Sequence, residues 1–288
     1  MACFVTTDGI AIHYELRGEG PPLYVCHGGP NGTYAYMPED LSPLEDRFTL
    51  IYHDYRGSGG SPPAPPDTYT FDQLADDLDQ LRRHLGHDRI TVMAHSLGGM
   101  VALSLVACHP SAVERLILVA VSPCTAPRLL FRRTLHALGV RRTLKALRKA
   151  SAYALLWSWK PEGPARRLAR WSIVQTLQEG MPALRAEVRR KQQRAAVEAD
   201  NALSLERQAR VADYLTLLPS LACPVLVVCG SRDAVFVAAA DVFRRYVPHA
   251  QIVVLPRVGH HPFIEAPTEF QRLIWTFVGM PSHGQRPT

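Results

Sequence analysis

The segment ITVMAHSLGGM contains the residue best placed for nucleophilic chemistry. A β-branched run leads into Ala94-His95-Ser96-Leu97-Gly98, and an apolar helical pattern follows. Small residues two before and two after a serine permit a sharp strand-to-helix turn, because larger side chains there would contact neighbouring backbone. Such a turn places the Ser96 hydroxyl at a helix N-terminus, where the macrodipole and unpaired amides favour the negative charge of an acyl-transfer intermediate.

This pattern resembles the nucleophile elbow of the α/β-hydrolase superfamily. The superfamily pattern is Gly-x-Ser-x-Gly, and this sequence has Ala94, the next smallest residue, in place of the first glycine. The resemblance implies an α/β-hydrolase fold, with a mostly parallel central sheet flanked by helices and an inserted helical cap. It also implies a reaction that needs no cofactor.

The segment His27-Gly28-Gly29-Pro30 follows an apolar run, at the position of the family's oxyanion loop. Paired glycines allow backbone N–H groups to face a substrate carbonyl. We expect the amides of Gly29 and Leu97 to form the oxyanion hole and His27 to be structural. The alternative is an ordinary glycine-rich turn after a strand.

The other two members of the family's triad are expected after two later apolar runs. Asp233 stands in CPVLVVCGSRDAVF and His260 in QIVVLPRVGHHPFIEAP, which gives the superfamily order Ser, Asp, His. The resemblance implies that Ser96 attacks, that His260 acts as general base and then general acid, and that Asp233 holds the imidazole tautomer. We prefer His260 to His261 because family members have Gly-His at this place, followed five residues later by a glutamate, here Glu265.

The segment HDYRGSGGS, together with His-Gly-Gly-Pro, resembles proline iminopeptidases. Asp54, Arg56 and Ser61 match the pattern D-x-R-G-x-G-x-S, and we expect them to brace the loops around the site. Two departures weaken the aminopeptidase interpretation. Asn31 stands where a glycine usually follows Pro30, and the elbow differs from the usual Gly-Gly-Ser-Trp-Gly.

Short apolar runs alternate with helical patterns, which is typical of a mostly parallel sheet. A hairpin is expected around Asp8-Gly9, and buried strands are expected at 23–26, 49–53, 90–94, 116–121, 225–229 and 251–255. Helices are expected at 70–85, with Thr70 as N-cap, and at 97–107.

The charge distribution marks an inserted segment. Residues 124–218 carry 19 Lys+Arg against 7 Asp+Glu, a balance of +12, and the rest of the chain carries 13 against 19, a balance of −6. This segment has helical spacing and no clear strand. We therefore predict a catalytic core of residues 1–123 and 219–280, a helical cap of residues 124–218, and a flexible tail of residues 281–288.

The substrate is expected to be a small molecule. We predict that it contacts Tyr34, His95, Trp157, Trp159 and Trp171, although these aromatic residues are equally compatible with ordinary packing. The arginines of the cap are compatible with an anionic substrate, with an acyl chain on an acidic carrier protein, with a membrane surface, or with a solvated helical face.

Composition excludes several classes of protein. The 288 residues are 47% hydrophobic and 20% charged, which describes a globular chain. The six cysteines have neither disulfide-framework nor zinc spacing, so no metal is predicted and a cytoplasmic location is expected. The sequence shows no secretion signal and no run of about 18 apolar residues that would predict a transmembrane segment. Nucleic-acid binding is not expected, because stacking motifs are missing.

The sequence therefore predicts a serine hydrolase that cleaves a small-molecule amide or ester. The first alternative is an N-terminal aminopeptidase of the proline iminopeptidase type. The second is a non-hydrolytic use of the fold, as a perhydrolase, a cyclase or a ligand receptor.

Overall fold

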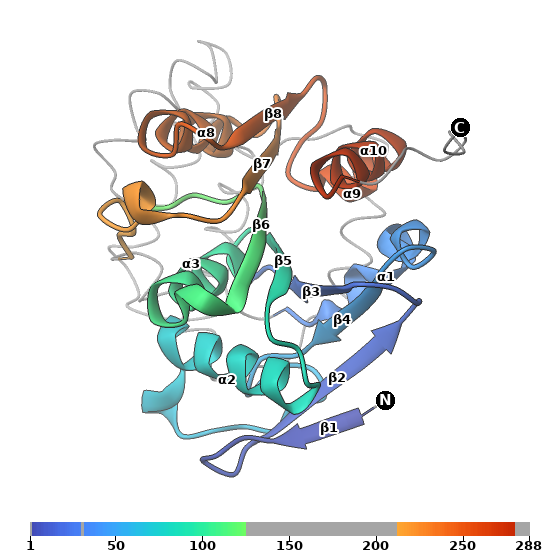
Figure 1. Ribbon diagram of the computed structural model, residues 1–288, viewed down its shortest axis with the longest axis vertical. Helices are drawn as coiled ribbons and strands as arrows, with labels where there is room; N and C mark the ends of the chain where they lie inside the picture. The colour runs from blue at the N-terminus through green and yellow to red at the C-terminus, as the bar shows by residue number, and fades with distance from the viewer. Residues whose placement is uncertain (1, 30–31, 125–211, 280–288) are drawn as a thin grey trace, which may run out of the picture.

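The computed structural model describes residues 2–29, 32–124 and 212–279 (Figure 1). Their strands form one eight-stranded sheet in the order β1-β2-β4-β3-β5-β6-β7-β8. The strands are β1 (Ala2–Val5), β2 (Ala11–Arg17), β3 (Pro22–Cys26), β4 (Thr49–His53), β5 (Ile90–His95), β6 (Val113–Val119), β7 (Val225–Gly230) and β8 (Gln251–Leu255). The pairs β1–β2 and β2–β4 are antiparallel and all other pairs are parallel. The predicted mostly parallel sheet is confirmed.

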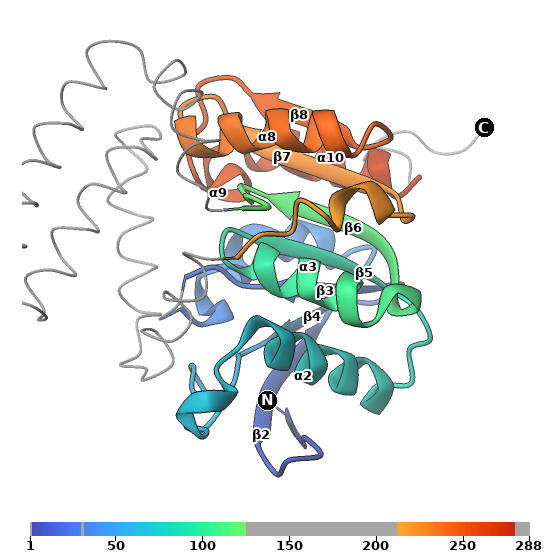
Figure 2. The same ribbon diagram turned by 90° about the vertical axis from the view of Figure 1, so that its left-hand side faces the viewer.

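Helices cover both faces of the sheet (Figures 1 and 2). One face packs against α2 (Phe71–His84), α3 (Gly98–Cys108) and α8 (Ala234–Tyr246). The other packs against α1 (Pro38–Leu41), α9 (Pro262–Glu265) and α10 (Pro267–Phe277). Short 3-10 turns lie at Tyr34–Tyr36, Ser42–Leu44, Pro66–Thr68, Pro110–Ala112 and Leu218–Ser220.

The central strands are buried on both faces because their side chains alternate between two apolar clusters. In β3, Tyr24 and Cys26 pack on the α2–α3–α8 side, while Leu23 and Val25 pack on the opposite side. This two-sided burial explains why the strands appear in the sequence as continuous apolar runs. The predicted ranges for β4 and β8 match the observed strands residue for residue.

Helix α2 begins at the predicted cap. The Gln73 amide donates to Oγ1 of Thr70 at 3.0 Å, which satisfies one of the orphan N–H groups of the first turn. Phe71, Leu74 and Leu78 are buried at helical spacing.

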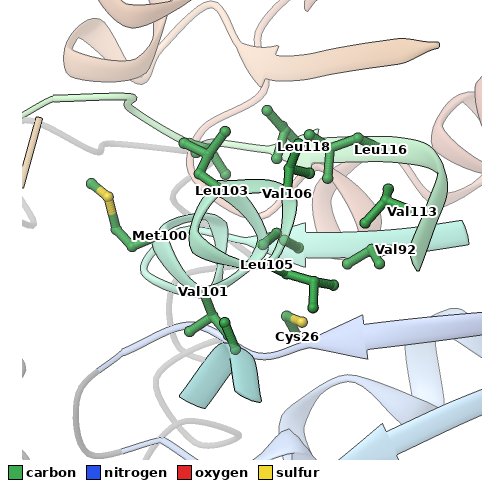
Figure 3. Packing of buried hydrophobic residues seen from close by; sticks show 14 of the residues in the cluster. Cys26, Val92, Met100, Val101, Leu103, Leu105, Val106, Val113, Leu116 and Leu118 are labelled. Atoms are coloured by element: carbon green, nitrogen blue, oxygen red, sulfur yellow. The ribbon is translucent and has the colours of Figure 1, made fainter. Parts of the chain in front are cut away.

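Helix α3 packs its apolar side chains on β5 and β6. Figure 3 shows Leu103 and Val106 beside Leu118 of β6, and Leu105 beside Cys26 of β3. This packing holds the N-terminus of α3 in place at the end of β5.

Shortening a core side chain in this layer should destabilise the protein. Leu116 is fully buried, so Leu116→Ala should lower the free energy of unfolding by about 3 kcal/mol through lost apolar burial and a residual cavity. Leu16→Ala is the matched control, because Leu16 is 48% exposed, and its effect should stay within about 0.5 kcal/mol. Denaturant unfolding of both variants measures the difference, and equal effects would contradict the assigned packing.

Strands β3, β5 and β7 each extend one residue beyond their predicted ranges, and β6 differs more. Residues 116–121 were the expected strand, but β6 spans Val113–Val119. Ala120 has a φ of 50°, in the left-handed region, which ends the extended conformation before Val121.

Most of the predicted cap, including Trp157, Trp159 and Trp171, and the predicted tail lie outside the described residues. Cys124 and Asp213 form an antiparallel bridge, and the Tyr214 amide donates to the Pro123 carbonyl oxygen at 2.9 Å. The chain therefore leaves and re-enters the sheet region at one place. Residues 212–218, which the sequence assigns to the cap, contribute Tyr214 and Leu218 to the α2–α3–α8 side of the core. The domain boundaries remain a prediction.

In the part of the chain that the structure describes, no helix is both long and apolar enough to cross a bilayer. All six cysteines are free thiols.

Candidate active site

The chain turns sharply between β5 and α3 at Ser96. Ser96 has a φ of 54°, a left-handed conformation that is uncommon for a residue with a Cβ atom. The Ser96 amide donates to the Val119 carbonyl oxygen at 2.9 Å, and its carbonyl oxygen accepts from Gly99 at 3.0 Å. These bonds to β6 and to α3 stabilise the strained turn, and the side chain remains partly exposed.

The small residues of the elbow have a steric explanation. A Cβ atom at Gly98 would lie 2.6 Å from the carbonyl oxygens of Cys26 and His27, far inside contact distance. Ala94 is fully buried in the α2–α3–α8 side of the core, where its methyl group is accommodated. The departure from Gly-x-Ser-x-Gly therefore leaves the elbow intact.

Adding a methyl group at Gly98 should disrupt the elbow. Gly98→Ala should abolish most of the activity and lower the free energy of unfolding by about 1–3 kcal/mol, because strand β3 must move to relieve the clash. The control is Gly86→Ala, which meets no atom within 4 Å but has a φ of 73°. It should cost about 1 kcal/mol of stability and leave activity unchanged. Thermal melts and steady-state rates separate the two effects, and a fully active Gly98→Ala would contradict the steric explanation.

His260 connects Ser96 to Asp233. Its Nε2 lies 3.0 Å from Ser96 Oγ, and its Nδ1 lies 2.6 Å from Asp233 Oδ2. His260, rather than the neighbouring His261, makes both of these contacts. The structure thus brings together the three residues that the sequence predicts as nucleophile, base and acid partner.

The ionisation of His260 suits a general base. Burial lowers its pKa to about 4, and the negative charge of Glu265 acts in the opposite direction. The imidazole is therefore neutral near neutral pH. With its proton on Nδ1, facing the Asp233 carboxylate, Nε2 is free to accept the hydroxyl proton of Ser96.

Asp233 occupies the N-cap position of α8, directly after β7, and is fully buried. A carboxylate at this position usually caps the helix, but the Asp233 side chain makes no capping hydrogen bond. Its Oδ2 contacts His260 instead. This use of the carboxylate distinguishes Asp233 from an ordinary strand-end aspartate.

Glu265 fixes the loop that carries His260. One of its carboxylate oxygens accepts from the Gly259 amide at 2.9 Å, and the other accepts from the His261 amide at 3.1 Å. The sequence pattern contained this glutamate but gave no physical role for it. Since the two bonds flank His260, they restrict its backbone on both sides.

The predicted oxyanion residues lie close to Ser96. A Cβ atom at Gly28 would lie 3.1 Å from Ser96 Cβ, so the Gly28–Gly29 turn packs directly on the elbow. Gly29 has a φ of 77°, which favours glycine. Among the described residues, the amides of Gly29 and Leu97 have no hydrogen-bond acceptor. Their role in an oxyanion hole remains a prediction that this arrangement permits.

The segment that contains Asp54 and Arg56 braces the surrounding loops. Arg56 is fully buried and forms ion pairs with Asp77 of α2 at 2.6 Å and with Asp8 at 2.9 Å. Asp54 accepts from the amides of Tyr34 at 3.2 Å and Gly60 at 2.9 Å. These contacts are structural and place no charge beside Ser96.

Two predicted substrate contacts have other partners in the structure. The Tyr34 hydroxyl donates to Glu15 Oε2 at 3.0 Å, on the side of β2. His95 is buried, and its ring nitrogens contact the Tyr36 hydroxyl and the His260 carbonyl oxygen. Neither placement supports substrate binding, because both side chains are buried and hydrogen-bonded to other protein groups. No motif in the sequence indicates the hydrogen bonds of the Tyr36 hydroxyl to Gly28 and His95.

The rings of Phe236, His261 and His95 pack beside the His260 imidazole. The centroid of the Phe236 ring lies 4.9 Å from the centroid of the imidazole. The His261 ring, with its centroid 5.1 Å away, is also buried.

Buried histidines should make the protein sensitive to acid. Burial lowers the pKa values of His27, His53, His95, His260 and His261. Below about pH 6.5 the unfolded chain therefore binds more protons than the folded chain. As the pH is lowered, the free energy of unfolding should decrease by up to about 1.4 kcal/mol per pH unit for each histidine. Denaturant unfolding over a pH series measures this slope.

His53→Leu provides the control for this prediction. The pKa of His53 is lowered to about 3, and its ring nitrogens make no hydrogen bond among the described residues. Removing His53 should make the free energy of unfolding depend less steeply on pH between about pH 6 and 5. This comparison of slopes holds even if the variant is more or less stable than the parent at neutral pH. An unchanged slope would contradict the assigned shift.

Comparisons with known proteins identify the family of this chain. The sequence model of the alpha/beta hydrolase fold matches residues 21–267. The chain is 26% identical over 275 residues to a putative carbamate hydrolase, RutD, of Enterobacter cloacae, covering 93% of this chain and 96% of that protein. It is 29% identical over 280 residues to a pimeloyl-(acyl-carrier protein) methyl ester esterase of Nitrosomonas europaea, covering 90% and 96%. The crystal structure of a proline iminopeptidase-related protein from Thermus thermophilus superposes with a TM-score of 0.74 at 27% identity, covering 97% of this chain and 98% of that one. The chain therefore belongs to the alpha/beta hydrolase fold family.

Proposed function

We propose that this protein is a cofactor-independent serine hydrolase that cleaves a small-molecule ester or amide through an acyl-enzyme on Ser96. The observation that carries the proposal is the contact series from Ser96 Oγ to His260 Nε2 at 3.0 Å and from His260 Nδ1 to Asp233 Oδ2 at 2.6 Å. It lies at a strained strand-to-helix turn, where the family places its nucleophile.

The proposed reaction has two halves. As Ser96 Oγ attacks the substrate carbonyl carbon, its proton moves to His260 Nε2, and the amides of Gly29 and Leu97 stabilise the oxyanion. His260 then gives that proton to the leaving alcohol or amine, which departs as the acyl-enzyme forms. A water molecule next loses a proton to His260 and attacks the acyl carbon, and the proton returns to Ser96 Oγ as the acid is released. Asp233 stabilises the imidazolium in both halves.

A substrate panel tests the activity and separates it from the first alternative. The panel compares 4-nitrophenyl esters of increasing chain length with aminoacyl naphthylamides. A serine esterase should hydrolyse the esters without needing a free amine, whereas an aminopeptidase should cleave only substrates with an unblocked N-terminus. Preference for the aminoacyl substrates would favour the proline iminopeptidase interpretation. Absence of turnover on the whole panel would favour a cyclase, a perhydrolase or a ligand receptor.

A narrower substrate class is supported by charge. We propose as a second candidate that the acyl substrate is carried by an acidic carrier protein, since residues 124–218 have 19 basic against 7 acidic groups. One relative is named an esterase of an acyl-carrier-protein ester. Hydrolysis of a carrier-bound methyl ester should then slow as salt rises, while hydrolysis of a neutral 4-nitrophenyl ester should not. Equal salt dependence would leave the arginines as a solvated surface. The cytoplasmic location expected from the sequence remains a prediction.

A further inference from the structure

Three hydrogen bonds connect the Gly28–Gly29 turn to the backbone of His260. The Gly28 amide lies 2.8 Å from Tyr36 Oη, Tyr36 Oη lies 2.8 Å from His95 Nδ1, and His95 Nε2 lies 3.0 Å from the carbonyl oxygen of His260. Tyr36 belongs to the 3-10 turn Tyr34–Tyr36, and His95 is the last residue of β5. The series therefore connects the Gly28–Gly29 turn, the Tyr34–Tyr36 turn and the end of β5 to the loop that carries His260.

The direction of each hydrogen bond follows from the groups at the two ends. The Gly28 N–H can only donate, and the His260 carbonyl oxygen can only accept. Burial lowers the pKa of His95 well below its ordinary value, so the ring is neutral and has one N–H. That proton must be on Nε2, which faces the carbonyl oxygen. Nδ1 then accepts from the Tyr36 hydroxyl, and Tyr36 Oη accepts from Gly28.

This arrangement is shielded from water. Tyr36 is 5% exposed and His95 is 2% exposed. The His95 ring also packs against the rings of His260, His261 and Phe263, with centroids 4.9, 5.0 and 5.1 Å away. A buried hydrogen-bond series with one possible direction is rigid, because the Tyr36 hydroxyl and both ring nitrogens of His95 are all engaged.

The two ends of the series lie at the groups that must face each other during the reaction. The Gly28 amide donates a hydrogen bond to Tyr36 Oη, and this bond orients the peptide that precedes the Gly29 amide. The carbonyl oxygen of His260 accepts a hydrogen bond from His95 Nε2. This bond restrains the backbone of the residue that is expected to act as base. Glu265 restrains the same loop from its other side, through Gly259 and His261.

We propose that Tyr36 and His95 are positioning residues that set the placement of the Gly29 amide relative to the His260 imidazole. The inference rests on the proposed serine-hydrolase function. The hydrogen bonds of these two side chains go to each other and to backbone groups of Gly28 and His260, and not to Ser96 Oγ or the His260 ring nitrogens. Their loss should therefore slow the chemical step and leave substrate binding nearly unchanged, because catalysis depends on sub-ångström placement that binding does not require.

The first test is Tyr36→Phe, which removes one hydroxyl and keeps the ring. On the best 4-nitrophenyl ester, kcat should fall about 10-fold or more, with KM within about 2-fold of the parent value. The matched control is Tyr24→Phe. The Tyr24 hydroxyl makes a 2.7 Å bond to His87 Nδ1, and Tyr24 is also fully buried. Both variants should lower the melting temperature, but Tyr24→Phe should keep the parent kcat.

The second test is rescue at position 95. A glutamine amide can occupy the place of His95 Nε2 and donate to the His260 carbonyl oxygen, whereas leucine cannot. His95→Gln should retain several-fold more kcat than His95→Leu, at similar KM. This comparison tests the positioning role of His95 even if Tyr36→Phe folds poorly.

Two results would overturn the proposal. One is a Tyr36→Phe enzyme with kcat within about 2-fold of the parent, and the other is equal loss of kcat in His95→Gln and His95→Leu. Ser96→Ala is assayed in the same series. If Ser96→Ala is inactive while the positioning variants are normal, only this inference fails, and if Ser96→Ala is fully active, the proposed function itself fails.

Discussion

Replacing Ser96 with alanine should lower kcat on any hydrolysed substrate by about 10³-fold or more. The reason is that Ser96 Oγ is the atom in hydrogen-bond contact with His260 Nε2, at 3.0 Å, and no covalent intermediate can form without it. The folded state should persist, because the backbone bonds of the elbow, from Ser96 to Val119 and from Gly99 to Ser96, do not use the side chain. Steady-state rates and circular dichroism of the purified variant check both parts.

Ser122→Ala is a matched control for this substitution. Ser122 is buried, and its hydroxyl donates to the Cys124 carbonyl oxygen at 2.5 Å, outside the contact series of the site. It should keep parent-like turnover. Turnover of Ser96→Ala within about 10-fold of the parent would remove Ser96 from the mechanism.

Asp233→Asn should lower kcat by about 10⁴-fold, the second large effect. The asparagine amide can donate to His260 Nδ1, which would hold the imidazole in the tautomer whose Nε2 carries a proton and cannot accept one from Ser96. It would also remove the charge that stabilises the imidazolium. The rate loss should appear in kcat rather than in KM.

Asp241→Asn is the control on the same helix. Asp241 pairs with Arg244 on the surface of α8, with its side chain 47% exposed, so it should leave both activity and stability nearly unchanged. A comparable loss of kcat in the two variants would show that the effect is not specific to the His260 contact.

Much of the fold could be predicted because the strands are buried on both faces and the turns have local chemistry. Thr70 at the start of α2 and the Asp8-Gly9 turn between β1 and β2 depend only on neighbouring residues. The end of β6 could not be predicted, because the left-handed Ala120 is imposed by its tertiary surroundings and alanine gives no local signal for it.

Part of the site could be predicted from a local steric pattern and from the positions of residues that follow parallel strands. Ser96 has a local steric signature in the glycine at position 98, and Asp233 and His260 each follow a strand, so the parallel sheet brings them to the same edge. His95 is predicted to contact the substrate, but the structure buries its ring against His260, His261 and Phe263, contacts that no local pattern in the sequence indicates. The contacts of the Tyr36 hydroxyl could not be predicted, because they join residues 8 and 59 positions away.

Covalent labelling with a fluorophosphonate tests the central claim most directly, since the probe reacts with an activated serine and needs no knowledge of the substrate. Intact-protein mass spectrometry should show one adduct, and peptide mapping should place it on Ser96. Ser96→Ala should form no adduct, and His260→Gln should form it more slowly than the parent protein. An unlabelled parent protein, or an adduct that persists in folded Ser96→Ala, would contradict an activated nucleophile at this elbow.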